Sequence, residues 1–307
     1  FIMDRVMHRI GLHGKSFIPL IMGFGCNVPA IMACRTIESR SSRLITILIT
    51  PFMSCSARIP IYLLLAGTFF AADASMVMIG LYVLGVVLAV VTARLMRRFM
   101  FPVDETPFVM ELPPYRLPTW KTTLTHMWDK CAQYLRKMGG MILIASMVVW
   151  FLSYYPRSEE GGTAVHYENS YLGRLGQSCA PIFSPLGLNW KAGVALLSGV
   201  PAKEIVVSTM AVLTDAGDNE ITLTEKLQEQ VYTQGDRAGE KVYTPLVAYS
   251  MMIFILLYFP CIAAITAIRK EAGRSWAAFT LFYTRVWHGL CRLSCIRSEV
   301  CSDPEIK

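Results

Sequence analysis

The chain has 307 residues, of which 54% are hydrophobic and only 17% charged, and its mean hydropathy is +0.44. Soluble domains carry about 25% charged residues, so the composition excludes an ordinary soluble enzyme and indicates a protein dissolved mostly in lipid. A net charge of +7 is typical of cytoplasmic loops in such a protein rather than of a nucleic-acid-binding face. Nine cysteines without a CxxC pair indicate neither a disulfide framework nor a structural zinc site.

Four apolar stretches are long enough to cross the roughly 30 Å hydrocarbon core of a bilayer. In chain order they are residues 44–70, 75–93, 138–155 and 244–268. The first is interrupted by Pro51, Arg58 and a short polar run, and the last by Pro260. The pattern predicts an all-α, polytopic membrane protein. Because the sequence begins without a start methionine or a signal peptide, we expect it to be the C-terminal part of a longer protein.

Two further apolar stretches, residues 17–34 and 190–213, contain helix breakers and polar groups that a simple span would avoid. Irregular backbone is tolerated at membrane depth only where protein buries it or where it lines a cavity. Basic clusters mark cytoplasmic loops, and such clusters occur near residues 35–43, 94–98 and 269–274. All three lie on the cytoplasmic side only if both stretches are re-entrant. The first then enters from the cytoplasm and the second from outside. Their breakers and polar groups are Gly23, Gly25, Asn27 and Pro29, and then Gly199, Pro201, Lys203 and Glu204.

A short internal repeat relates these two stretches. The tripeptide Val-Pro-Ala occurs at residues 28–30 and again at residues 200–202. Each re-entrant stretch precedes a span that holds a proline and a cysteine, Pro51 with Cys55 and then Pro260 with Cys261. Inverted-topology transporters have this organisation, and their sites lie near the midplane between broken helices. We therefore predict two inverted repeats with re-entrant, broken helices.

The segment between the repeats, residues 94–137, holds five prolines and then an amphipathic stretch at 119–137. We predict a cytoplasmic loop followed by a helix on the inner membrane surface, with a helix packed on protein as an equal alternative. The predicted division is 1–93 for the first repeat and its following span, 94–137 for this segment, 138–283 for the second repeat with its neighbouring spans, and 284–307 for a tail.

Several long strings resemble the membrane domain of the FeoB family of ferrous iron transporters. They include GLHGKSFIPLIMGFGCNVPAIMACRTIESR, TILITPFMSCSARIPIY, PFVMELPPYRLPTW, GVPAKEIVVSTMAVL and LLYFPCIAAITAIRKEAGRSWAAF, and they run from about residue 1 to residue 282. The resemblance implies a nucleoside-transporter-like architecture with paired gate regions in the bacterial inner membrane. It also implies that Fe²⁺ is the transported substrate.

The same resemblance implies partners that this sequence lacks. An N-terminal GTP-binding domain would bring GTP and Mg²⁺, and small cytoplasmic Feo accessory proteins would join it, while homo-oligomerisation is left open. We expect no enzyme activity and no nucleic-acid binding in this chain. Gly14-Lys15-Ser16 is not a P-loop, because Arg9 stands where the motif requires glycine.

The tail departs from the family. From about Thr284 the sequence carries Arg285, His288 and Arg292, and each central arginine costs roughly 2.5–3.5 kcal/mol in a lipid-embedded helix. A reading-frame slip near Thr284 explains the departure, and the coding DNA would decide it. The cysteines of this tail, at positions 291, 295 and 301, are therefore not interpreted as a metal site.

Candidate transport residues follow from the chemistry of ferrous iron, which accepts thiolate, amide and carboxylate ligands. Cys26, Cys55 and Cys261 each stand beside proline or glycine in a broken segment, and the resemblance places the pore cysteines there. A buried free cysteine is otherwise a small hydrophobe, and Cys34, Cys131 and Cys179 are interpreted in that way.

Polar neighbours extend this set. Asn27 and Ser54 either supply an oxygen ligand or cap a helix break. Intramembrane ionisable residues indicate function by default, so Glu204 is a candidate ligand or relay. Its alternatives are a salt bridge with Lys203 or a favourable place at a helix N-terminus. Arg58 repels a cation, and we expect it, like Lys203, to be a structural charge. The gate backbone is predicted at Gly23, Gly25, Pro29, Gly199, Pro201 and Pro260.

Three other functions are alternatives to iron transport. A nucleoside or small-solute carrier of similar architecture would need aromatic and amide groups rather than three cysteines. An intramembrane enzyme would need a motif such as HExxH or GxSxG, and neither occurs. A regulatory fragment without transport of its own is the third alternative.

Overall fold

The structure, a computed structural model, describes residues 2–101, 119–156, 169–183, 189–214, 220–231, 241–258 and 260–284. Within these ranges the regular secondary structure is helical, apart from one isolated β-bridge between Val231 and Lys241. Three helical stretches are long and apolar enough to cross a membrane, Arg40–Phe69, Ala74–Phe99 and Pro245–Glu271. They match three of the predicted spans, so the all-α membrane class is confirmed.

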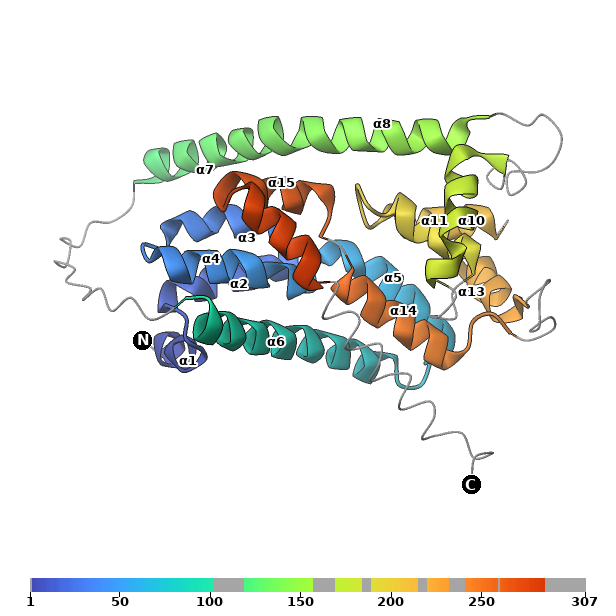
Figure 1. Cartoon of the computed structure of the whole chain (residues 1–307), viewed down its shortest axis with the longest axis horizontal. Helices are drawn as coiled ribbons and strands as arrows, with labels where there is room; N and C mark the ends of the chain where they lie inside the picture. Colours follow the sequence, from blue (N-terminus) through green and yellow to red (C-terminus); the bar gives the residue numbers. More distant parts are fainter. Residues whose placement is uncertain are drawn as a thin grey trace, which may run out of the picture.

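The first repeat consists of helices that are interrupted at the predicted positions (Figure 1). After α1 (Ile2–Ile10), the first re-entrant stretch forms α2 (Phe17–Gly25) and α3 (Asn27–Ala33). The following span forms α4 (Arg40–Ile49) and α5 (Ile59–Phe69), separated by two short 3₁₀ turns. Proline cannot donate a backbone hydrogen bond, and Pro51 accordingly stands in the first of these turns. The unbroken α6 (Ala74–Phe99) then follows, and it continues past the predicted end of its span at residue 93.

The second repeat repeats the pattern of interruptions. The second re-entrant stretch forms α11 (Trp190–Ser198) and α12 (Ile205–Leu213), and the last long span forms α14 (Pro245–Leu257) and α15 (Ile262–Glu271). Pro260 lies in the gap between α14 and α15. The accompanying helices are α10 (Tyr171–Phe183), α13 (Glu220–Glu229) and a helical segment at residues 274–284.

The two repeats share one core and pack on each other in related ways. The largest apolar cluster joins Phe52, Tyr62 and Leu65 of the first repeat to Leu196 and Met252 of the second. Helix α3 packs against α15, and α12 packs against α5, so the second half of each re-entrant stretch contacts the second half of the other repeat's broken span. Helix α6 supports α4, α5 and α14. The predicted two-repeat architecture is therefore present.

An ion pair fastens the first repeat to the end of the second. Arg35, in the 3₁₀ turn Cys34–Thr36 after α3, donates from Nε to Glu271 Oε2 at 2.7 Å and from its Nη2 to the other carboxylate oxygen. Glu271 is the last residue of α15, and the two partners are 236 positions apart in the sequence. The paired arrangement has the bidentate geometry that makes arginine–carboxylate contacts strong.

The segment between the repeats differs from its predicted form. Helix α7 (Trp120–Tyr134) continues through a π-helical turn, Leu135–Gly139, into α8 (Gly140–Tyr154), and Figure 1 shows one long helix along an edge of the molecule. At about 1.5 Å per residue it is about 52 Å long, longer than the hydrocarbon core of a bilayer. The predicted boundary between residues 137 and 138 falls inside the π turn. The helix does not end there, because the π turn continues it through Gly139 and Gly140. The position of α7 on the inner membrane surface stays a prediction.

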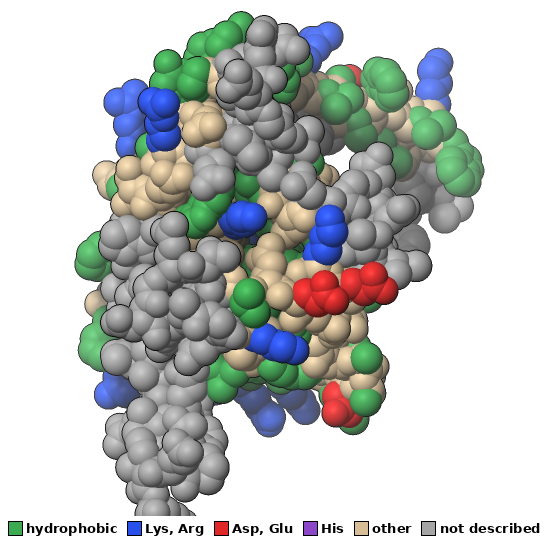
Figure 2. All heavy atoms as spheres, turned by 90° about the vertical axis from the view of Figure 1, so that its right-hand side faces the viewer, with side chains coloured by type: hydrophobic (Ala, Val, Ile, Leu, Met, Phe, Trp, Pro, Cys, Tyr) green, Lys and Arg blue, Asp and Glu red, His purple; other side chains and the backbone are tan. Residues whose placement is uncertain are grey.

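The opposite end of the molecule from α1 is formed by α10, α11 and α13 (Figure 1). Figure 2 looks onto this end, where acidic and basic side chains are interspersed with hydrophobic ones, as expected of a surface that meets water. The five prolines of the segment between the repeats and the tail beyond Thr284 lie outside the described residues.

Candidate functional site

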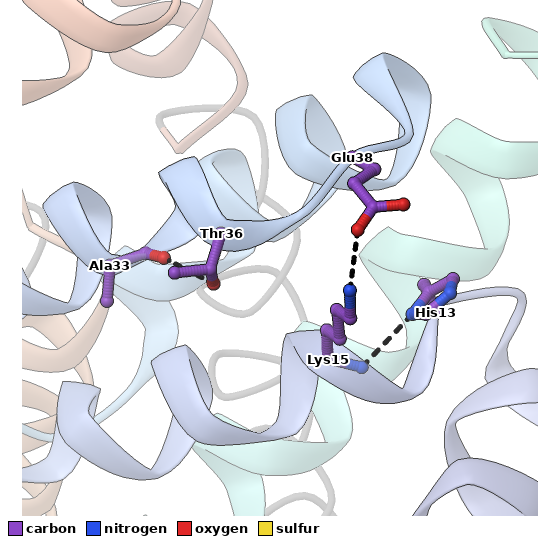
Figure 3. A network of polar contacts seen from close by, with 5 residues as sticks. All are labelled: His13, Lys15, Ala33, Thr36 and Glu38. Atoms are coloured by element: carbon purple, nitrogen blue, oxygen red, sulfur yellow. Dashed lines mark hydrogen bonds and ion pairs between the residues drawn. The ribbon is translucent and has the colours of Figure 1, made fainter. Parts of the chain in front are cut away.

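The first re-entrant stretch begins and ends on the same side of the molecule. Lys15, just before α2, donates from Nζ to Glu38 Oε1 at 2.7 Å, beyond the end of α3 (Figure 3). Its backbone N–H donates to His13 Nδ1 at 3.2 Å. Ser16 is fully buried and its hydroxyl accepts a hydrogen bond from Thr46 of α4. These contacts confirm a re-entrant hairpin and leave residues 14–16 as a structural turn. We call α2, Cys26 and α3 the first hairpin.

The second re-entrant stretch closes in the same manner. Lys191, near the start of α11, donates from Nζ to the carbonyl of Leu213 at the end of α12, at 3.2 Å. A Cβ atom placed on Gly199 would collide with Val206 Cγ2, so the absent side chain lets the two helices approach. We call α11, residues 199–204 and α12 the second hairpin.

All three candidate cysteines stand where a helix is interrupted. Cys26 has an extended backbone, with φ −149° and ψ 130°, between α2 and α3. Cys55 precedes the 3₁₀ turn that leads into α5, and Cys261 is the N-cap residue of α15. Each of these residues is partly exposed.

The structure brings these cysteines into one region without closing a ligand set. Cys26 and Cys261 pack against the same apolar cluster of α3 and α15, and Cys55 and Cys261 lie within electrostatic reach of each other. The backbone N–H of Ile262, next to Cys261, donates to the carbonyl of Val200 in the second hairpin at 3.3 Å. In the described part of the chain, no three His, Cys, Asp or Glu side chains converge as a metal site.

Buried oxygens lie next to the cysteines. Ser54 Oγ and the hydroxyl of Tyr62 are both buried and lie within hydrogen-bonding reach of each other. Asn27 Oδ1 is buried and makes no hydrogen bond. An unpaired buried polar atom is costly, so its presence indicates a ligand or a water at that place. Sequence reasoning missed Tyr62, because a tyrosine in an apolar helix carries no signal that separates it from a core residue.

Close backbone contacts join the first hairpin to the break in the following span. Ser56 Oγ donates to the carbonyl of Gly25 at 2.8 Å. A Cβ on Gly23 would lie 3.1 Å from the side chain of Met53, whereas a Cβ on Gly25 would meet nothing. Cys26 and Cys55 are therefore held on adjoining irregular segments.

Arg58 and Lys203 place two buried basic side chains among these breaks. Arg58 is 1% exposed and donates from Nη1 to Met53 O at 3.0 Å and from Nη2 to Pro51 O at 3.1 Å. Lys203 is 6% exposed, its Nζ donates to Ile255 O at 3.4 Å, and it lies 5.9 Å from the centre of the Tyr258 ring. Both side chains reach carbonyls at the interruption of a membrane span.

Glu204 lies differently from its neighbour. It is exposed at the N-terminal end of α12, where its side chain makes no capping hydrogen bond. It forms no ion pair with Lys203, since Lys203 points into the protein. The structure therefore leaves Glu204 outside the buried group, and its part in transport stays a prediction.

Cys34 and Cys131 have the surroundings of residues without a ligand role. The Cys34 thiol is fully buried and donates to the carbonyl of Ala30 at 3.3 Å. Burial raises the pKa of this thiol to about 12, so it stays protonated at neutral pH. Cys131 is exposed on α7, far along the chain from the helix breaks.

Comparison with protein families gives two matches that together cover most of the chain. The family model Gate, described as nucleoside recognition, matches residues 1–69 and 135–275, which include both hairpins and both broken spans. The model for the ferrous iron transport protein B C terminus matches residues 78–130, from α6 into α7. No solved structure matches the chain.

Curated relatives extend along nearly the whole chain. A protein of Porphyromonas gingivalis named Fe(2+) transport protein A/Fe(2+) transporter FeoB fusion protein is 50% identical over 92% of this chain and 38% of its own length. The Fe(2+) transporter FeoB of Methanocaldococcus jannaschii is 41% identical, over 93% of this chain and 42% of its own. That of Campylobacter jejuni is 41% identical, over 92% and 45%. The chain thus spans less than half the length of these relatives.

Proposed function

The chain belongs to the FeoB family of Fe(2+) transporters, and from that premise we propose that it is the permeation part of a ferrous iron importer. It would work as a multi-pass protein of the bacterial inner membrane. The observation that carries the proposal is the gathering of three thiols and of buried oxygens at three adjoining helix breaks. Broken helices at membrane depth are the usual place of ion sites in transporters.

In this proposal Fe²⁺ exchanges its water for protein ligands along the breaks. A hydrated cation cannot enter lipid, so thiols and oxygens must replace its water shell. Cys26, Cys55 and Cys261 would supply sulfur, and each thiol loses its proton when it coordinates. Asn27 and Ser54 would supply oxygen. Glu204, exposed at the edge of the second hairpin, would meet the ion as a carboxylate on the aqueous side.

The ligands are spread over both hairpins and both broken spans, so a full coordination shell requires that these elements move. The two hairpins contact the broken spans of the opposite repeat, which makes each hairpin a candidate gate. The close approach at Gly199, where a Cβ atom would collide with Val206, and the tight contact of Gly23 with Met53 support this. Alternating or gated access is the mechanism we propose.

The remaining parts of the importer lie outside this chain. An N-terminal domain would bind GTP with Mg²⁺ and drive or regulate the gates, and small cytoplasmic Feo proteins would bind beside it. This chain itself would catalyse no reaction. Support comes from the relatives, whose lengths exceed the matched part more than twofold, and from one relative whose name joins Fe(2+) transport protein A to FeoB.

The first prediction tests the three cysteines in the full-length protein. With Cys26, Cys55 and Cys261 all replaced by Ser, we expect uptake of radiolabelled Fe²⁺ to fall more than tenfold, because losing even an outer-shell partner costs about 10–100-fold. The measurement is initial uptake into cells with equal amounts of protein in the membrane. Cys131→Ser is the matched control and should transport normally. Unchanged uptake in the triple variant would remove the cysteines from the mechanism.

Nucleoside transport is the second candidate, because the Gate match is described as nucleoside recognition. A base and ribose require aromatic and amide groups, whereas the described breaks present thiols and two buried basic side chains. Uptake of a labelled nucleoside by the same cells separates the two functions. Nucleoside uptake that survives the triple cysteine change, without iron uptake by the wild type, would favour the carrier.

A further inference from the structure

Lys203 occupies a position with the properties of a cation site. Its ammonium group reaches Ile255 O, one of the last four carbonyls of α14. These carbonyls have no partner within their own helix, and they carry the negative end of the helix dipole. The ring of Tyr258, 5.9 Å away, offers its negative face to the same group. Carbonyls at the end of a half-helix are the groups that hold cations in other transporters.

No negative side chain accounts for this buried charge. Among the described residues Lys203 has no carboxylate partner. The charged and titratable groups within electrostatic reach are Arg58, which repels it, and the thiols of Cys55 and Cys261. A buried ammonium is costly unless it is paired. Within the described part of the chain, the amino group of Lys203 is therefore held by one carbonyl and one ring face alone.

The neighbouring cation, Arg58, shows what a structural charge looks like in this protein. Arg58 belongs to the segment whose carbonyls it binds, and it makes two hydrogen bonds of 3.0 and 3.1 Å. Lys203 comes from the second hairpin, on a different element from its acceptor, and makes one hydrogen bond of 3.4 Å. The single long hydrogen bond of Lys203, which joins separate elements, is therefore more easily broken than the two hydrogen bonds of Arg58.

We propose that the C-terminal end of α14 is a cation site on the pathway, that the Lys203 ammonium fills it while the pathway is empty, and that a divalent metal ion occupies it only when Lys203 withdraws. The inference rests on the proposed function, since the competing cation is the transported one. Lys203 then competes with the metal ion for this site while it remains attached to the second hairpin. Movement of that hairpin removes the ammonium and opens the site in one step.

The test is Fe²⁺ binding by purified full-length protein under reducing conditions, measured by equilibrium dialysis with labelled iron. Lys203→Leu removes the competing charge, so we expect the Kd for Fe²⁺ to fall about tenfold or more, as expected from losing a nearby like charge. In uptake assays the KM should fall together with the maximal rate, since the ion is no longer displaced. Lys203→Arg should keep weak binding. Lys270→Met, which removes an exposed lysine at the end of α15, should match the wild type.

The outcomes separate the inference from the function on which it rests. If the wild type binds and transports Fe²⁺ and Lys203→Leu has an unchanged Kd, the competitor role is wrong and iron transport stands. If the wild type neither binds nor transports Fe²⁺, the proposed function itself fails. Lys203→Gln keeps a hydrogen-bond donor without the charge, so it serves if the leucine variant does not fold. Failure of both variants to fold would assign Lys203 to structure and overturn the inference.

Discussion

The two repeats interrupt their membrane spans in the same way but stabilise the interruptions differently. In the first repeat the freed carbonyls are held by Arg58, from the same stretch of chain, through two hydrogen bonds. In the second repeat one carbonyl, Ile255 O, accepts a single longer hydrogen bond from Lys203, which belongs to a different element. The fold therefore duplicates the geometry of a broken span and not its chemistry. The contacts of Arg58 fix the first break within its own stretch of chain, whereas the contact of Lys203 at the second break depends on the position of the second hairpin.

The two hairpins differ in a corresponding way. The first is interrupted at a single residue, Cys26, and is tied to the adjoining span by the bond from Ser56 to Gly25. The second is interrupted over residues 199–204, with Lys203 directed inward and Glu204 exposed. The longer irregular segment gives the second hairpin more room to rearrange. This difference predicts that the first hairpin supplies buried ligands, and that the second hairpin supplies the moving charge in addition to the exposed Glu204.

The largest effect on stability is expected at the fixed break. Arg58→Leu leaves two buried carbonyls without a donor, and each such loss costs about 1–3 kcal/mol. We expect the free energy of unfolding to fall by about 2 kcal/mol or more, seen as a lower melting temperature of the purified protein. The melting temperature of Lys203→Leu should fall less, because only one long hydrogen bond is lost. Equal losses in the two variants would contradict the distinction between the breaks.

A smaller effect is expected from glycines in the two hairpins. Gly199→Ala forces a methyl group into Val206, whose branched side chain cannot turn away easily. We expect a loss of about 1–3 kcal/mol, as for other overpacked sites. Gly25→Ala meets nothing and is the matched control, with a melting temperature near that of the wild type. A loss in Gly25→Ala as large as that in Gly199→Ala would show that the close approach at Gly199 is unimportant.

The smallest effect on stability is expected from the ion pair between Lys15 and Glu38, which joins the two ends of the first hairpin. The side chains of Lys15 and Glu38 are 35% and 59% exposed, and exposed ion pairs contribute about 0.2–1 kcal/mol. Lys15→Ala, Glu38→Ala and the double variant should each change the melting temperature slightly, and a double-mutant cycle gives the coupling. High salt should weaken it further. A coupling well above this range would mean that the pair holds the hairpin closed.

Much of this architecture was predictable because proline and glycine act locally. Pro51 and Pro260 cannot continue a hydrogen-bonded helix, so the interruptions of both broken spans could be located from the sequence. The re-entrant geometry followed from charge, since basic loops restrict the topology. Both predictions depend on residue type and position, which the sequence contains.

Features that depend on tertiary contacts were not predictable. Lys203 and Glu204 are adjacent in a segment with no regular period, so no pattern indicates which one is buried, and the contact with Ile255 decides it. The continuity of α7 and α8 is similar, because glycine is a poor helix former and yet the π turn Leu135–Gly139 carries the helix through. The burial of the Tyr62 hydroxyl beside Ser54 becomes visible only in the packed structure.

The ion pair between Arg35 and Glu271 has a consequence for how the protein is made. Its partners are 236 residues apart, so at about 5–20 residues per second of synthesis the first hairpin waits about 12 to 47 s for α15. Until then the backbone beside Cys26 has cover from its own repeat, through Ser56, but lacks the contact of α3 with α15. The fastening of the first hairpin to the second repeat is therefore completed only after α15 has been synthesised.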